Sequence, residues 1–141
     1  MKKVREKHFD LTDDQFEKQF ESLMLNPVLF SHEAHLRLAW IHITRYGVDG
    51  AIENITNQIK AFAAFHGDHD KYNHTVTIVA VRVVYHFMLK SNSDNFRDFI
   101  SKSARLKTGF RQLIETHYST NIFTSTEAKT HYLAPDLQPF D

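Results

Sequence analysis

The feature that most constrains the fold of this chain is a segment of eighteen residues, 73–90, that contains neither Gly nor Pro. The segment is rich in β-branched residues, which by propensity alone would favour a strand. Strands in globular proteins span about five or six residues, so an uninterrupted segment of this length fits a buried helix better. The sequence therefore predicts a helix over residues 73–90. Polar residues interrupt its most apolar part, residues 76–89, which is shorter than the roughly 20 residues of a membrane span, so we expect no membrane partner.

Capping residues and glycines divide the rest of the chain into further helices. The Thr12-Asp13-Asp14-Gln15 segment has the capping-box pattern and predicts a helix over residues 12–25. Ser31 can cap a helix that runs to Tyr46, where Gly47 is free to adopt the positive φ of a helix C-terminus. Apolar stripes and caps predict further helices over residues 51–66, 94–101 and 105–117, and a short one that starts in the capping box at residues 124–127.

Together these elements predict an all-α protein, a single-domain bundle of five to seven helices that spans residues 1–141. The chain has 141 residues, of which 42% are hydrophobic, and this is enough for one packed domain. We expect the helices over residues 31–46 and 73–90 to pack face to face in the middle. We also expect residues 1–10 to be flexible and residues 134–141 to form an extended tail.

Charge and cysteine content exclude several classes of function. Lys and Arg balance Asp and Glu at 17 each, and no basic patch stands out, so we expect no nucleic-acid partner. The absence of Cys excludes disulfides, thiolate metal sites and cysteine nucleophiles, so any metal would bind nitrogen and oxygen. The N-terminal residues are basic but lack the apolar stretch of a secretory signal, and we therefore expect a cytoplasmic protein.

The histidines are the strongest candidates for chemistry. Ten occur in the chain, and His32 and His35 share one face of the predicted helix, close enough to ligate one ion. His74, at the start of the 73–90 helix, is the best candidate for a third ligand. Three such ligands with an open position are typical of a catalytic divalent ion, here Zn, Fe, Mn or Ni. A histidine on a helix face is often a hydrogen-bonded core residue instead, and that interpretation stays open.

Neighbouring polar residues could serve the same site. We expect Tyr72 and Asn73 to orient a ligand and Glu33 or Asp70 to assist in acid–base chemistry. His8 is expected at the surface or at the end of a helix. The His32-Glu33-Ala34-His35 segment is one residue shorter than the metalloprotease motif, in which the histidines are four apart. No Gly-rich phosphate loop or dinucleotide fingerprint occurs in the chain.

The segment from Phe30 to Trp40 resembles an uncharacterised family of small bacterial helical proteins that carry a Phe-x-His-x-x-His-Leu-x-x-Ala-Trp motif. The match to a Lys-Tyr-His-Glu-Thr segment lies at residues 71–75, and a Pro-Asp-Leu tail matches residues 135–137. The resemblance implies that His32, His35 and the segment around Tyr72 meet in one site. This chain has Asn73 and His74 where the family pattern has His and Glu, a change that keeps one good ligand and removes another.

Three functions fit these observations. The first is a His-based or metal-dependent enzyme that acts on a small molecule through the residues named above. The second is a non-enzymatic helical module that uses the same pocket to bind a small apolar ligand or a protein partner. The third is a structural or self-associating protein, a homo-oligomer included, in which the polar residues satisfy one another in the core.

Overall fold

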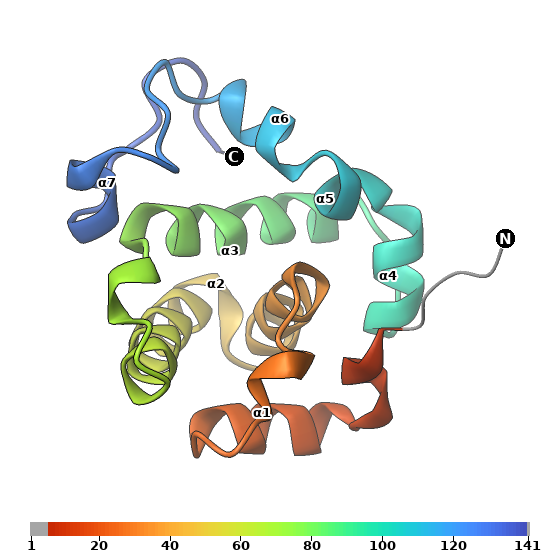
Figure 1. The fold of residues 1–141 in the computed structure, drawn as a ribbon. Coiled ribbons are helices and arrows are strands. Elements are labelled where there is room, and N and C mark those ends of the chain that lie inside the picture. Colours follow the sequence, from red (N-terminus) through yellow and green to blue (C-terminus); the bar gives the residue numbers. More distant parts are fainter. Residues whose placement is uncertain (1–5, 141) are drawn as a thin grey trace, which may run out of the picture.

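The computed structural model describes residues 6–140 and consists of helices joined by short turns (Figure 1). No strand occurs in this part of the chain, so the all-α prediction is confirmed. The α-helices are α1 (Asp13–Glu21), α2 (His32–Phe65), α3 (His74–Leu89), α4 (Phe96–Lys102), α5 (Ala104–Thr108), α6 (Phe110–Glu115) and α7 (Thr126–Thr130). One 3₁₀ turn, η1 (Lys7–Asp10), precedes α1, and two more, η2 (Pro27–Leu29) and η3 (His69–Lys71), lie on either side of α2.

A sharp bend divides α2 into the two helices that the sequence predicts. At Gly47 the backbone has φ 77° and ψ 170°, a conformation that residues with a Cβ rarely adopt. Residues 32–46 and 48–65 therefore form two separate helical halves. They lie close together, since the amide of Asn54 in the second half is 3.4 Å from Nδ1 of His42 in the first.

The long helix predicted from the Gly- and Pro-free segment is α3, and its most extensive packing is against α2 (Figure 1). Asn73 caps α3, with its side-chain oxygen accepting the Val76 N–H at 3.0 Å. Val81 of α3 is buried and borders the same space as Leu36 and Ala39 from the first half of α2. The sequence prediction that these two helices pack in the middle of the bundle is thus confirmed.

Two of the predicted helices end earlier than expected. The first stops at Glu21 because Leu23 adopts a positive φ of 66°, and the N–H groups of Met24 and Leu25 then bond back to the Gln19 carbonyl. The predicted 105–117 helix is divided at Gly109, which ends α5 and starts α6. Glycine lowers helix stability in such a position, which favours a helix end there.

Residues 6–10 were expected to be flexible, but they fold onto the bundle. His8 is fully buried and contacts α2, so its predicted place at the surface is wrong. Residues 1–5 and 141 lie outside the described part of the chain. The tail from residue 134 to 140 forms no helix or strand and packs Phe140 against the core, while Leu137 is exposed.

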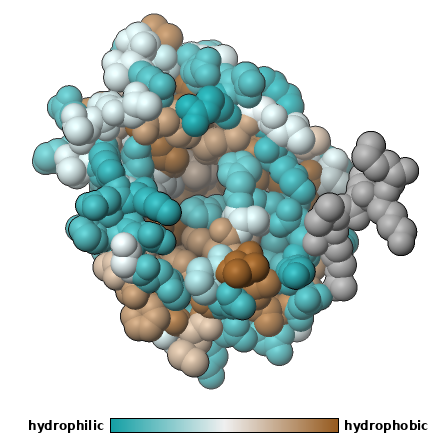
Figure 2. Space-filling model, viewed as in Figure 1, coloured by the Kyte–Doolittle hydropathy of each residue, from teal (hydrophilic) through white to brown (hydrophobic). Residues whose placement is uncertain are grey.

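Hydrophilic residues cover most of the face drawn in Figure 2, and hydrophobic residues show at the bottom of a central hollow. Within residues 6–140, none of the helices has both the length and the apolar character that crossing a bilayer requires.

Candidate binding cavity between α2 and α3

A small cavity of about 160 Å³ lies between the two halves of α2 and the first half of α3. Most of its wall is apolar, and a few polar groups converge on it, the composition typical of a ligand site. The polar lining residues are His32, His35, Lys71, Asn73 and Thr77, and the apolar ones are Leu36, Ala39, Ile55, Ile59, Val76, Ala80, Val81 and Phe110.

The cavity opens next to a broader groove of about 520 Å³. Four residues line both spaces: His32, His35, Val76 and Phe110. The groove adds polar and basic side chains from α5 and α6, among them Lys107 and Arg111. A molecule that entered the cavity would therefore pass polar groups at the surface before it reached an apolar interior.

The His32 imidazole lies at the mouth of the cavity, and one of its nitrogens is already used. Its Nε2 is 3.0 Å from the Leu106 carbonyl oxygen, which can only accept, so Nε2 carries the hydrogen. In the neutral ring Nδ1 is then an acceptor. The ring also contacts Phe110 edge to face, which fixes its orientation.

His35 is the most unusual polar group of the site. Its ring stacks on Phe30, with centroids 3.9 Å apart, and Phe30 packs in turn on Phe20 and Phe62. Within residues 6–140 its nitrogens have no hydrogen-bond partner. Burial, together with the nearby charge of His32, lowers the pKa of His35 from its ordinary value of 6.5 to about 4. His35 is therefore neutral at physiological pH.

Asn73 lines the cavity, but both ends of its amide serve the fold. Besides capping α3, it donates from Nδ2 to the Ile122 carbonyl at 2.9 Å and so fixes the C-terminal region. Tyr72 and His74, by contrast, do not line the cavity and form a hydrogen bond of 2.8 Å with each other. Burial raises the pKa of Tyr72 to about 12, and it lowers the pKa of His74, which the charges of Lys60 and His131 lower further.

The predicted metal ligands do not come together in this structure. Within residues 6–140, one group has three His or carboxylate ligand atoms within 4.8 Å of one another, and it consists of Glu6, His8 and Glu33. The set His32, His35 and His74 does not meet this condition. The reason is geometric. The side chain of His74 leaves the first turn of α3 towards Tyr72, while His35 stacks on Phe30 across the cavity.

Glu33 belongs to a separate buried cluster and does not serve the cavity. Adjacent helical residues point about 100° apart, so Glu33 faces the N-terminal segment when His32 faces the cavity. Its Oε2 lies 2.6 Å from His8 Nε2, and its Oε1 lies 3.0 Å from Lys107 Nζ. Glu6 Oε1 completes the cluster by accepting the Ser31 hydroxyl at 2.6 Å.

By distance this group could hold a metal ion, but its hydrogen bonds oppose one. Arg37 has only donors, and its NH1 lies 3.3 Å from His8 Nδ1, so Nδ1 accepts and Nε2 carries the hydrogen that points to Glu33. A metal on Nε2 would require that hydrogen on Nδ1, against the guanidinium. Burial lowers the pKa of His8, consistent with a neutral ring. The hydrogen bonds of this cluster thus hold residues 6–10 against α2.

Sequence reasoning missed two lining residues, Lys71 and Thr77. Thr77 lies one helical turn after Asn73, so an i, i+4 search from Asn73 would have found it. Lys71 lies in η3, and nothing local in the sequence indicates that its stem borders the cavity.

Comparisons of the chain with protein families, with curated proteins and with solved structures give no match. The resemblance of residues 30–40 to a family of small bacterial proteins therefore stays a prediction.

Proposed function

We propose that this protein binds a small, largely apolar molecule in the α2–α3 cavity, and that His35 accepts a hydrogen bond from the one polar group of that molecule. The observation that carries the proposal is the presence of a neutral imidazole without a hydrogen-bond partner on the wall of an apolar cavity. His35 is partly exposed, so the polar group of a ligand would replace water at its ring nitrogen, and the apolar surroundings would strengthen that hydrogen bond.

The dimensions of the cavity define the ligand. A cavity of about 150 Å³ in another protein accommodates benzene, so the 160 Å³ available here suits a molecule with one ring or a short branched chain. Leu36, Ile55 and Ile59 would contact its apolar part. A longer ligand would extend into the groove towards Arg111.

Binding is a better use of His35 than acid–base catalysis. A general base works best when its pKa lies near the working pH, and a pKa of about 4 makes His35 a weak base at neutral pH. The same pKa keeps one ring nitrogen available as an acceptor. An enzyme that uses His35 as its base is therefore the less favoured alternative.

Phenol and toluene test the proposal because they have nearly the same shape and differ in one hydroxyl. We expect both molecules to shift the ¹H–¹⁵N resonances of residues around the cavity. Phenol should bind about fivefold more tightly than toluene, because one net hydrogen bond contributes about 1 kcal/mol to the binding free energy. Binding of phenol should also shift the ¹⁵N resonance of one His35 ring nitrogen. The His35→Phe variant should bind the two molecules equally well.

A second pair of variants tests the place of binding. Ala80 lines the cavity, whereas Ala61 is exposed on the second half of α2 and lies outside it. Ala80→Leu should fill the cavity and abolish binding of both molecules, and Ala61→Leu should leave binding unchanged. Tight phenol binding by Ala80→Leu, or a persistent phenol preference in His35→Phe, would contradict the proposal.

A further inference from the structure

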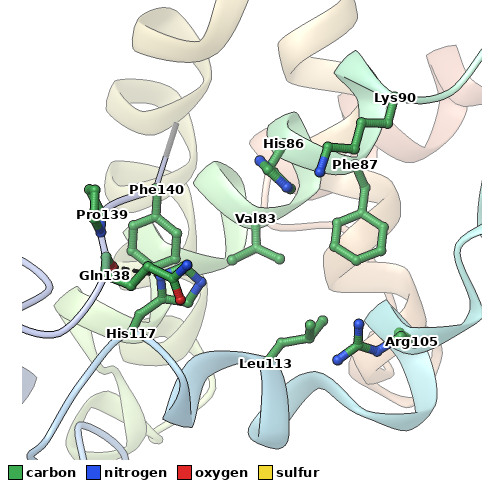
Figure 3. A pocket seen from close by; sticks show the side chains of 10 residues that line it. All are labelled: Val83, His86, Phe87, Lys90, Arg105, Leu113, His117, Gln138, Pro139 and Phe140. Atoms are coloured by element: carbon green, nitrogen blue, oxygen red, sulfur yellow. Dashed lines mark hydrogen bonds between the residues drawn. The ribbon is translucent and has the colours of Figure 1, made fainter.

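A second and larger pocket lies on the other side of α3, in a region that the proposed function does not use. It has a volume of about 480 Å³ and is formed by the second half of α3, by α5 and α6, and by residues 138–140 of the tail (Figure 3). Val83, Phe87 and Leu113 give it an apolar floor. None of its lining residues lines the α2–α3 cavity or the adjacent groove.

The polar side chains that line this pocket are mainly basic. His86 comes from α3, Lys90 follows the end of α3, Arg105 comes from α5, and His117 follows α6 (Figure 3). No Asp or Glu is among its described lining residues. In the part of the chain from residue 6 to 140, no carboxylate oxygen pairs within 4.0 Å with Lys90 or Arg105, although Lys102 and Lys107 nearby both have such partners.

The positive groups of this pocket are close enough to affect one another. Burial lowers the pKa of His86, and the positive charges of Lys90 and His117 lower it further. A bound anion would act in the opposite direction on the same ring, because it would favour the protonated form.

The tail forms a fixed wall of the pocket. The Nδ1–H of His117 can donate to the Gln138 carbonyl at 2.7 Å, and the His117 ring stacks on Phe140 with centroids 4.2 Å apart. The Leu137 N–H also donates to the His117 carbonyl at 3.0 Å. Because Nδ1–H donates to the tail, Nε2 of the neutral His117 ring is an acceptor, so His117 fixes this wall of the pocket and does not donate to an oxyanion.

We propose that this basic pocket binds a small organic oxyanion, a carboxylate or a phosphate that bears one apolar group. Arg105 offers a planar fork that suits two oxygens of such a group, and Lys90 adds a compact charge. The apolar group lies on Phe87 and Leu113, which border the same space. Both a carboxylate and a phosphate can accept hydrogen bonds from Arg105 and Lys90, and the relative affinities of benzoate and phenyl phosphate distinguish them.

Calorimetry with phenyl phosphate, benzoate and inorganic phosphate tests the proposal. We expect phenyl phosphate or benzoate to bind and inorganic phosphate to bind at least about tenfold more weakly, because it cannot use the apolar floor. The tighter of the two organic anions identifies the oxyanion. The ¹H–¹⁵N spectrum should place the shifts at residues 83–90, 105–117 and 138–140.

Substitutions of single basic residues test which positive charges contribute to binding of the organic anion. Arg105→Gln and Lys90→Gln should each weaken binding of the organic anion by about tenfold, as expected for loss of one charge-assisted contact. Arg97→Gln on α4 and Lys18→Gln on α1 change the net charge equally at exposed sites away from the pocket and should bind as the parent does.

Three results would overturn the proposal: no binding of either organic anion, equal binding of inorganic phosphate, or equal losses in the pocket and control variants. Because the probes and residues differ from those of the α2–α3 cavity, either proposal can fail while the other stands.

Discussion

The lowered pKa of His35 makes the stability of this protein depend on pH in a calculable way. The folded protein holds the pKa of His35 at about 4, whereas the unfolded chain restores its ordinary value of 6.5. Below pH 6.5 the unfolded state therefore binds more protons, and stability falls as the pH drops from about 6.5 to about 4. From pH 7.5 to pH 5 this one group should cost about 2 kcal/mol of unfolding free energy.

Urea unfolding of the parent and of His35→Gln measures this contribution. Trp40 is the single tryptophan and is 7% exposed, so its fluorescence should report loss of the core. Burial also lowers the pKa values of His8 and His42, and these groups add to the pH dependence of both proteins. The difference between the two proteins isolates His35 and should amount to about 2 kcal/mol between pH 7.5 and pH 5.

An exposed histidine provides the matched control. The His69 side chain is 73% exposed, so His69→Gln should retain the pH dependence of the parent. A direct NMR titration of the His35 ring should give a midpoint near pH 4. If His35→Gln loses as much stability on acidification as the parent does, or if the ring titrates near 6.5, the reasoning about the buried neutral imidazole is refuted.

Three further substitutions test the fold by urea unfolding at pH 7.5. Gly47→Ala should lower the free energy of unfolding by about 1–3 kcal/mol, because a φ of 77° and a ψ of 170° strain any residue with a Cβ. The strain is in the backbone alone, since no atom lies within 4 Å of the added Cβ. Gly109, which has a negative φ, is the control and should tolerate Ala better. Arg37→Ala should cost about 1–3 kcal/mol, since it leaves Nδ1 and the carbonyl of the buried His8 without their donor and breaks the ion pair with Asp13. Thr75→Val removes a fully buried hydroxyl that bonds His131 and Leu133 and should cost about 1–3 kcal/mol. Losses below 0.5 kcal/mol would contradict each of these assignments.

The helices could be predicted because the signals that define them are local. The caps at Thr12 and Ser31 each bond to a backbone N–H three residues away, and such a contact is visible in the sequence. The cap of α7 is Ser125, one residue later than the capping-box pattern at residues 124–127 predicts. The helix α3 follows from the length of a segment without Gly or Pro. The shared face of His32 and His35 follows from helical periodicity alone, and both residues line the same cavity.

The partners of these residues could not be predicted, because they come from distant parts of the chain. His8 and Glu33 are 25 residues apart, and their bond depends on how residues 6–10 fold onto α2. Whether His74 would join His32 and His35 depended on how α3 packs on α2, and in the fold His74 bonds Tyr72, two residues away, instead. Sequence periodicity gives the face of a helix on which a residue lies, but not which element covers that face.

The sequence by itself thus determined the helices, their order and the side chains that share a face, since each depends on bonds within about one turn. Only the tertiary structure decided which faces meet. It left His35 neutral beside an apolar cavity, buried Glu33 against His8, and brought Lys90, Arg105 and His117 around one pocket. The physical reason is that burial and long-range charge, which set the chemistry of these groups, arise only when separate helices pack together.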